Sequence, residues 1–297
     1  MAVQILCIAG PTASGKSSRA VEEALVRNGE IISVDSRQVY RGLDVGTEKI
    51  TKEEMRGVPH HLIDIREPNE SYSAGDFVVD ATRLIKEITE RGKLPILVGG
   101  THFYFNALLA GLPTGVDANP ALRKELETLP SEELFARIRE RDPRRAADLD
   151  PQNRRRLIRA LEIIDSLGTV PPRNSREVRL HYQVVKSDFP TMQVEWIVID
   201  PPRTELRAQI DARLAIALEH GLVDEVRRVR EQVGDARLNE LGLEYKIVGE
   251  FLNLGVSPLS WGETPKLLLQ TLSAKLWQYA RRQKAWLRKL LGGPTAK

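Results

Sequence analysis

Residues 10–17 read GPTASGKS, which fits the pattern G-x-x-x-x-G-K-[ST] of a phosphate-binding loop. In such a loop (P-loop) the glycines let backbone N–H groups turn around a diphosphate, the lysine neutralises its charge, and the serine hydroxyl reaches a magnesium ion. An ordinary glycine-rich turn can match the same pattern, so the flanking sequence decides. The run VQILCIA before the loop is of strand type, and SSRAVEEALVRNG after it has helical spacing and ends on Gly29. The predicted diphosphate-binding residues are Gly10, Pro11, Thr12, Ala13, Ser14, Gly15, Lys16 and Ser17.

The composition is that of a globular protein. The 297 residues fit one large domain or two small ones, with 41% hydrophobic and 29% charged side chains. No run approaches the roughly 18 apolar residues of a membrane helix, and the strand-like start MAVQILCIAG lacks the charged leader of a signal peptide. A single cysteine, Cys7, excludes an internal disulfide and a cysteine-based zinc site. A cytoplasmic location is therefore expected.

Positive charge is concentrated in two segments, although the net charge is only +3. Residues 141–186 contain 11 basic and 6 acidic side chains, and residues 275–297 contain 7 basic side chains and no acidic ones. Such blocks are typical of proteins with a polyanionic partner. A solvated helix face is the alternative that charge alone leaves open.

The first 111 residues alternate strand and helix patterns, which predicts an α/β fold around a mostly parallel sheet. The expected strands are residues 3–9, 30–35, 61–65 and 94–100, and the expected helices include residues 74–92 and 101–111. Ligands of such sheets bind beyond the carboxyl ends of the strands. The phosphate loop, Asp35, Asp64 and Gly99-Gly100 are all expected there.

The sequence becomes helical and arginine-rich from about Pro113 to Pro190, and EWIVIDPP at 195–202 then returns as a strand. Helices are expected at 203–221, at 222–234 and from about residue 265 to 291. The predicted fold is a P-loop-containing parallel sheet with flanking helices and an inserted, mainly helical subdomain. Residues 1–112 and 191–297 are expected to form the catalytic core, and residues 113–190 the insert.

Asp35 directly follows a predicted strand, so its carboxylate is expected beside the phosphate loop. Geometry alone leaves three roles open. Asp35 can cap the following turn, bind magnesium as in nucleotide hydrolases, or act as a general base on a nucleophile beside the diphosphate.

Further motifs extend over almost the whole chain in one order. They are D-S-x-Q-x-Y at 35–40, G-T-x-K at 46–49, PHHLIDI at 59–65, YSAGDF at 72–77, LVGGTHFYFNALLAGL at 97–112, NRRRLIRALEI at 153–163 and YARRQKAWLR at 279–288. With the phosphate loop, this set resembles the tRNA dimethylallyltransferases, also called tRNA isopentenyltransferases. Because eukaryotic members carry a Cys/His zinc finger, the single cysteine makes the chain similar to the short bacterial form.

The resemblance implies a reaction in which no phosphate is transferred. The loop would bind dimethylallyl diphosphate with Mg²⁺, and N6 of the adenosine immediately 3′ of the anticodon in tRNA would attack the allyl carbon, giving N6-isopentenyladenosine and pyrophosphate. The family flips that base out of the anticodon loop to meet the donor from the opposite side, at a cost of a few kcal/mol. The implied partners are the tRNA anticodon stem-loop and dimethylallyl diphosphate, with no membrane and no obligate protein partner.

The resemblance also assigns the catalytic residues. Asp35 orients N6 and accepts its proton, while Lys16 and a Mg²⁺ near Ser17 stabilise charge on the leaving diphosphate. Thr101 matches a threonine near the diphosphate, and Arg213 matches an arginine that binds pyrophosphate. Without the resemblance, Arg213 would be interpreted as a helix-surface arginine. The tRNA-binding residues implied by the resemblance are Asp35, Ser36, Arg37, Gln38, Arg155, Arg156, Arg159, Tyr245 and Lys246.

The chain departs from the family at GLEYK, residues 242–246, where members have an adjacent Gly-Tyr pair. Three alternative functions share the phosphate loop. An adenylate isopentenyltransferase would prenylate free AMP, ADP or ATP and would not need the basic helical insert. A small-molecule kinase or a nucleotide-switched binding protein would bind ATP or GTP tightly and have no use for an allyl donor.

Overall fold

A computed structural model of the chain divides it into two compact units. The first comprises residues 1–108 and 189–297, and the second comprises residues 109–188. The predicted boundaries at residues 112–113 and 190–191 lie outside the described residues. No helix in the part of the chain described is both long and apolar enough to cross a bilayer. The structure describes residues 3–111, 116, 118–172, 192–253 and 264–292.

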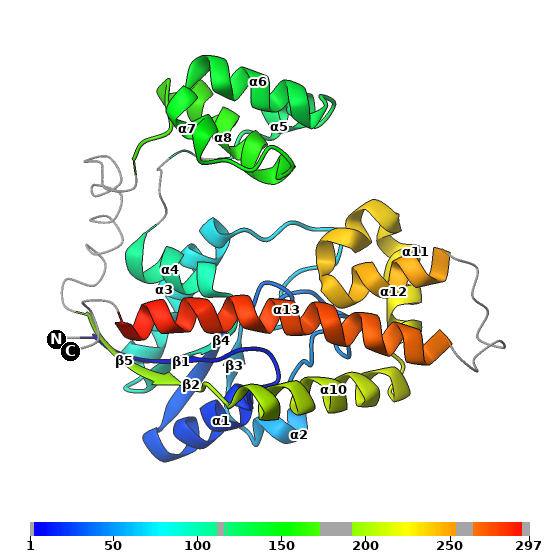
Figure 1. The fold of residues 1–297 in the computed structure, drawn as a ribbon. Coiled ribbons are helices and arrows are strands. Elements are labelled where there is room, and N and C mark those ends of the chain that lie inside the picture. The colour runs from blue at the N-terminus through cyan, green and yellow to red at the C-terminus, as the bar shows by residue number, and fades with distance from the viewer. Residues whose placement is uncertain (1–2, 112–115, 117, 173–191, 254–263, 293–297) are drawn as a thin grey trace. The chain divides into compact units, whose positions relative to one another are not determined.

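Among the described residues, five strands form one parallel sheet in the first unit, in the order β3-β2-β4-β1-β5 (Figure 1). The strands are β1 (Val3–Ala9), β2 (Gly29–Val34), β3 (His60–His61), β4 (Leu94–Gly99) and β5 (Met192–Val198). Parallel neighbours need long crossover connections, which helices provide here. The predicted α/β fold with a P-loop at the end of β1 is confirmed.

Four strands of this sheet end at the same level. The residues paired in one row across β5, β1, β4 and β2 are Val198, Ala9, Gly99 and Val34. Gly10, Gly100 and Asp35 therefore leave the sheet side by side. A Cβ atom on Gly99 would overlap the carbonyl group of Val34, so glycine is required for this close approach.

Helices α1 (Lys16–Arg27) and α3 (Ala74–Glu90) pack on the sheet through apolar faces. In α1, Ala20, Val21 and Ala24 are buried in a cluster with Leu6 of β1 and Ile31 of β2. Figure 1 shows α13 (Thr264–Gly292), in orange to red, alongside α10 (Arg203–Glu219), on which it packs. The helices of this unit are α1 (Lys16–Arg27), α2 (Lys52–Met55), α3 (Ala74–Glu90), α4 (His102–Ala110), α10 (Arg203–Glu219), α11 (Leu222–Leu241), α12 (Leu243–Asn253) and α13 (Thr264–Gly292).

The predicted strand at 61–65 is wrong for most of its length, since β3 contains only His60 and His61. Leu62 and Asp64 have φ angles of 63° and 54°, which turn the chain out of the sheet. The Asp64 amide donates instead to the Gln38 carbonyl, and the Asp64 carboxylate accepts a hydrogen bond of 2.5 Å from Lys49. Local hydrogen bonds to the 38–49 segment thus replace strand pairing.

One predicted helix end also differs. The first helix ends at Arg27 with Asn28 in the left-handed conformation, and Gly29 already belongs to β2. Asparagine tolerates a left-handed φ, which is why no glycine is needed at that cap. The helix predicted at 222–234 does end at Gly234, whose φ of 72° and ψ of 170° are not helical. A second helical stretch, which shares the label α11, continues from there to Leu241.

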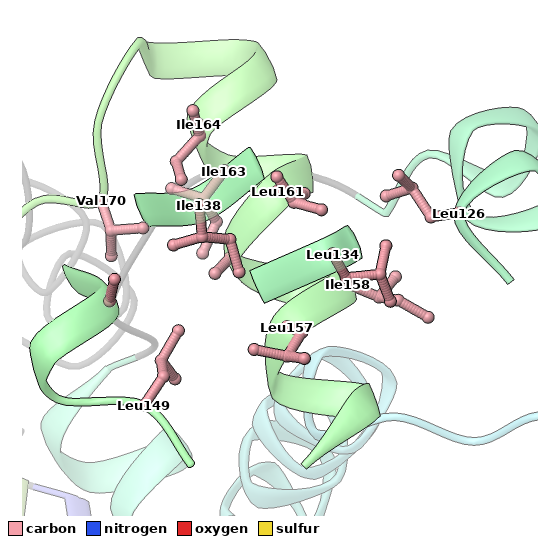
Figure 2. Packing of buried hydrophobic residues seen from close by; sticks show 12 residues of the cluster. Leu126, Leu134, Ile138, Leu149, Leu157, Ile158, Leu161, Ile163, Ile164 and Val170 are labelled. Atoms are coloured by element: carbon pink, nitrogen blue, oxygen red, sulfur yellow. The ribbon is translucent and has the colours of Figure 1, made fainter. Parts of the chain in front are cut away.

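The second unit is helical in its described part and contains α5 (Pro120–Leu126), α6 (Ser131–Arg141), α7 (Pro143–Ala147) and α8 (Arg154–Leu167). Figure 2 shows its apolar core, where Leu134 and Ile138 of α6 approach Leu157 and Leu161 of α8. Burying each such side chain stabilises the fold by about 1.5–3 kcal/mol. The unit therefore has a hydrophobic core of its own.

A buried carboxylate stabilises the same unit. Glu162 accepts hydrogen bonds from Arg123 at 2.7 Å, from the Asn119 amide at 2.9 Å and from Arg159 at 3.2 Å. Burial opposes ionisation, but these hydrogen bonds outweigh it and lower the pKa of Glu162. Arg159 also donates to the Val116 carbonyl at 2.6 Å, so this arginine helps to hold the unit together.

A second buried carboxylate lies in the sheet. Glu30 of β2 pairs with Arg91 at 2.6 Å, with Lys93 at 3.0 Å and with His61 at 2.8 Å. Burial alone would raise the pKa of Glu30, but the hydrogen bonds from Arg91, His61 and Lys93 lower it to about 2. Glu30 thereby joins β2 and β3 to the segment between α3 and β4.

We predict that Glu30→Gln lowers the free energy of unfolding by about 2 kcal/mol at pH 7, because charged hydrogen bonds of this kind are lost. The pKa of Glu30 falls from 4.5 to about 2 on folding, so this stabilisation exists above pH 4.5 and disappears as the pH falls toward 2. Urea unfolding of both proteins from pH 7 to pH 3 should show the difference shrinking below pH 4.5. The surface pair Arg83–Glu87 provides the control, since Glu87→Gln should cost less than about 0.5 kcal/mol. A pH-independent difference for Glu30→Gln would contradict the assignment.

Candidate active site

A cavity of about 280 Å³ lies in the first unit, beyond the carboxyl ends of β1, β2 and β4. Arg155, Arg156 and Arg159 belong to the second unit, and Lys246 is exposed on α12 outside the cavity lining. The sequence-predicted site residues that the cavity brings together are Thr12, Lys16, Ser17, Asp35, Ser36, Arg37, Gln38, Thr101, Arg213 and Tyr245.

A second cavity, of about 880 Å³, borders the rest of the phosphate loop at Ala13, Ser14 and Gly15. The two cavities share five lining residues: Lys16, Ser17, Glu48, Ile50 and Arg213. Lys16 and Arg213 are therefore accessible from both cavities.

The phosphate loop has the backbone geometry that an anion site requires. Gly15 has a φ of 77° and precedes α1, whose amino-terminal N–H groups favour a negative charge. A Cβ on Gly10 would lie 2.5 Å from the Ser14 hydroxyl and 3.0 Å from the Ile199 carbonyl oxygen, so a larger residue would force its neighbours to shift. Lys16 donates to the Pro11 carbonyl at 3.2 Å. Burial lowers the pKa of Lys16, and the carboxylates of Glu48 and Asp35 partly oppose this shift.

Asp35 is oriented by its own turn. Its Oδ1 accepts hydrogen bonds from the amides of Arg37 at 2.7 Å and Gln38 at 3.3 Å. Within the described ranges, no hydrogen bond to Oδ2 is present, and the carboxylate lines the cavity that also contains Lys16. The turn-capping role is thus observed, and it leaves one carboxylate oxygen for another partner.

Thr101 and Gln38 connect the loops around Asp35. The Ser36 amide donates to the Thr101 hydroxyl at 3.2 Å, and the Thr101 amide donates to the Val34 carbonyl at 3.2 Å. Gln38 donates to the carbonyls of Thr47 and Glu48, both at 3.2 Å. The ends of β2 and β4 are therefore tied together beside the cavity.

Arg213 is not a surface arginine, since only 11% of its side chain is exposed. It forms ion pairs with Glu48 at 3.2 Å and Glu244 at 3.4 Å, and it donates to the Thr12 hydroxyl of the phosphate loop. Burial raises the pKa of Glu244, and the charge of Arg213 opposes that shift. Helix α10 thus places a cation directly against the phosphate loop.

A family model described as IPP transferase matches residues 38–290 of the chain. The chain belongs to this family. It is 40% identical over 293 residues to a tRNA dimethylallyltransferase of Thermomicrobium roseum, with 96% of this chain and 84% of the relative covered. A tRNA dimethylallyltransferase of Halalkalibacterium halodurans is 39% identical, with 97% and 89% covered.

Solved structures agree with this membership. The tRNA isopentenylpyrophosphate transferase of Bacillus halodurans has a TM-score of 0.67 and 38% identity, with 96% of this chain and 87% of that chain covered. A eukaryotic dimethylallyltransferase acting on tRNA has a TM-score of 0.75 and 24% identity, with 96% and 69% covered. The latter likeness supports the fold alone.

Two buried residues that complete the site were not predicted from the sequence: Glu225 and Gln283. Glu225 of α11 accepts hydrogen bonds from three consecutive amides, those of Asp44 at 2.9 Å, Val45 at 2.8 Å and Gly46 at 2.9 Å. A glutamate in a charged helix such as LVDEVRRVREQVG gives no sequence signal of this role. Gln283 lies in the YARRQKAWLR motif, which marked its importance without indicating its contacts.

Tyr245 is part of the Glu225 site. Only 1% of Tyr245 is exposed, and its hydroxyl donates to Glu225 at 2.6 Å. Burial, followed by the charge of Glu225, raises the pKa of Tyr245. A Cβ on Gly46 would lie 2.8 Å from the Tyr245 ring. The ring thus shapes the 44–46 loop, and its expected contact with RNA stays a prediction.

We predict that Glu225→Gln lowers the free energy of unfolding by about 2 kcal/mol, because an amide group cannot accept all four hydrogen bonds. Tyr245→Phe removes one donor of the four and should cost about 1 kcal/mol. The control is Glu231→Gln at an exposed position of the same helix, which should be nearly neutral. Urea unfolding measures all three. Equal effects of Glu225→Gln and Glu231→Gln would refute the buried acceptor role.

Proposed function

We propose that the chain transfers a dimethylallyl group from dimethylallyl diphosphate to N6 of the adenosine immediately 3′ of the anticodon in tRNA. The products are N6-isopentenyladenosine in tRNA and pyrophosphate. The two bacterial relatives described above, which carry the name tRNA dimethylallyltransferase and match over most of their length, support this activity. The observation that carries the proposal is the placement of two cations, Lys16 and Arg213, in one cavity with the Asp35 carboxylate.

We propose that the two cavities serve as separate approaches for the two substrates. We place the diphosphate at Lys16, Arg213 and the amino terminus of α1, where three sources of positive potential converge. The adenine base then enters on the Asp35 side. A separate entrance for each substrate allows the nucleophile and the leaving group to lie on opposite sides of the allyl carbon.

Asp35 is the proposed base of this reaction. Its Oδ1 is held by two amides, and its Oδ2 accepts a hydrogen bond from the exocyclic amino group of adenine. The N6 lone pair forms a bond to the allyl carbon while the carbon–oxygen bond to the diphosphate breaks. The proton leaves N6 for Asp35, and the electron pair of the broken bond leaves with pyrophosphate.

Lys16 and Arg213 stabilise the leaving group. As negative charge grows on pyrophosphate, the pairs of Arg213 with Glu48 and Glu244 can exchange for phosphate oxygens. We place Thr101 beside the diphosphate. The Thr101 hydroxyl also accepts a hydrogen bond from the Ser36 amide. Preorganised donors of this kind each contribute on the order of 3 kcal/mol to such reactions.

The donor set fits a magnesium ion. No cluster of three His, Cys, Asp or Glu side chains able to hold a metal is found among the described residues, and Mg²⁺ usually binds through substrate phosphates and few protein ligands. We propose that the Ser17 hydroxyl would hold it, together with diphosphate oxygens. When bound, the ion would supply positive charge for the departing diphosphate.

The second unit is the proposed contact for the anticodon stem-loop. Arg155 and Arg156 are exposed on α8, and Arg159 donates hydrogen bonds to Glu162 and to the Val116 carbonyl. Ser36, Arg37 and Gln38 lie beside Asp35 and are proposed to contact the target base and its neighbours. A cytoplasmic location, where tRNA is modified, belongs to the same proposal.

The decisive experiment offers labelled dimethylallyl diphosphate with either unmodified tRNA or AMP. We expect label in tRNA, and none when the adenosine 3′ of the anticodon is replaced by guanosine. Label in AMP alone would point to an adenylate isopentenyltransferase. Hydrolysis or transfer of an ATP phosphate, with no use of the allyl donor, would instead favour a kinase.

We predict that Asp35→Ala lowers the single-turnover rate of prenyl transfer by about 10²- to 10⁴-fold, the usual contribution of a positioned base. Affinity for tRNA should stay within about threefold. As a control, Asp80→Ala removes a carboxylate that is bonded to Tyr72 outside both cavities, and it should leave the rate unchanged. A rate for Asp35→Ala close to that of the wild type would exclude the assigned role.

We predict that replacing Arg155 and Arg156 together by alanine weakens tRNA binding without changing the affinity for the donor. Each phosphate contact contributes about one unit to the slope of log K against log salt, so the slope should fall by up to about two. Arg159 is left intact because its loss would also break the Glu162 hydrogen bonds. An unchanged slope in the folded double variant would show that these two side chains form a solvated face instead.

A further inference from the structure

Gln283 of α13 is a buried polar side chain that binds two loops from different strands. Its Oε1 accepts the Thr12 amide at 2.9 Å, and its Nε2 donates to the Gly100 carbonyl at 3.0 Å. Only 4% of the residue is exposed, and it lines the cavity described above. Both ends of the carboxamide are therefore used, one on each side of the site.

We propose that Gln283 is a positioning residue for prenyl transfer, which fixes the phosphate loop relative to the loop that carries Thr101. This inference rests on the proposed function and extends it to a residue with no assigned role. Gln283 acts through the backbone groups that it binds. The reacting atoms are contacted by other side chains.

The chemistry of the two contacts selects glutamine. Thr12 offers an N–H donor and Gly100 offers a carbonyl acceptor, so the side chain between them must accept at one atom and donate at another. A carboxylate cannot donate to Gly100, and an apolar side chain can do neither. The partners also fix which end of the carboxamide faces which loop.

The contacts continue on both sides of Gln283. Thr12, whose amide donates to Gln283, also accepts a hydrogen bond from Arg213 at its hydroxyl. Thr12 is therefore held between α13 and α10. Gly100, whose carbonyl accepts from Gln283, precedes Thr101 in the chain. The Thr101 hydroxyl in turn accepts a hydrogen bond from the amide of Ser36, the residue next to Asp35. Hydrogen bonds and peptide bonds between adjacent residues thus connect Arg213, the proposed pyrophosphate ligand, to Asp35, the proposed base.

Steric fit supports the pairing. A Cβ on Gly100 would lie 2.6 Å from the Gln283 Nε2, so the helix side chain fills the space that a larger residue would need. Because misplacement by about 1 Å can reduce a rate about 100-fold, a contact that fixes these loops has a large kinetic effect.

A purely structural role is the alternative, since other polar side chains also anchor α13. Lys284 donates to the Pro201 carbonyl at 2.5 Å, and Ser273 donates to Asp211. Ser273 is buried on the same helix but lines neither cavity, so Ser273→Ala is a matched control. If Gln283 only anchored the helix, its loss would resemble that of Ser273.

The test compares Gln283→Leu, Gln283→Glu, Gly100→Ala and Ser273→Ala with the wild type. We expect Gln283→Leu to lower the single-turnover rate at least 30-fold while tRNA affinity stays within twofold. The rise in Tm caused by pyrophosphate with Mg²⁺ should fall to less than half. Gln283→Glu, which keeps the shape and loses the donor, should show the same kinetic defect. Ser273→Ala should lower Tm alone.

A double-variant cycle tests the coupling directly. Gly100→Ala and Gln283→Leu act on one contact, so the combined variant should be little slower than the slower single variant. Independent, multiplying effects would overturn the proposal, as would a Gln283→Leu rate within threefold of the wild type. The pyrophosphate measurement needs no tRNA. A wild-type protein that fails to prenylate tRNA would therefore refute the proposed function, and the Tm shift would still decide whether Gln283 positions the phosphate loop.

Discussion

The row of paired residues Val198, Ala9, Gly99 and Val34 determines which groups can meet beyond the sheet. Since the strands are parallel and end in register, the residues that follow them start from one line. Gly99 removes the Cβ that would push β2 and β4 apart, so Asp35 and Thr101 lie close enough for the Ser36 amide to bind the Thr101 hydroxyl. The phosphate loop starts one residue beyond Ala9 in the same row. The register of the sheet therefore determines where the loops that line the cavity begin.

The sheet alone leaves the loops unsupported, and the carboxy-terminal helices supply what is missing. The Glu225 carboxylate of α11 accepts hydrogen bonds from the three backbone amides of residues 44–46. Arg213 of α10 donates hydrogen bonds to the Gly46 carbonyl and to the Thr12 hydroxyl. Gln283 of α13 connects Thr12 to Gly100. Buried polar groups are costly without partners, so each of these side chains is stable only when its loop is in place. Helices and loops thus fix each other.

The sequence was most informative where one residue type has a single physical use. Glycines and a lysine at fixed spacing predicted the phosphate loop, and a strand followed by Asp35 predicted a carboxylate at the sheet edge. It was least informative where a contact joins distant segments. Nothing in the local pattern separates buried Glu225 from exposed Glu231 on the same helix, and the apolar run at 61–65 gave no sign that Asp64 would turn toward Gln38. Arg159 likewise looked like its neighbours until its pairing with Glu162 was seen.

The hydrogen bond between Thr12 and Gln283 spans 271 positions of the chain. At ribosomal rates of about 5–20 residues per second, the phosphate loop is made on the order of tens of seconds before its partner glutamine. During that interval, strands β1, β2 and β4 can pair, yet the loop lacks both Arg213 and Gln283 for most of the time. A growing polypeptide on the ribosome is thus without the two side chains that bind Thr12 in the folded protein. Under the role proposed for Gln283, prenyl transfer would require α13 to have left the exit tunnel.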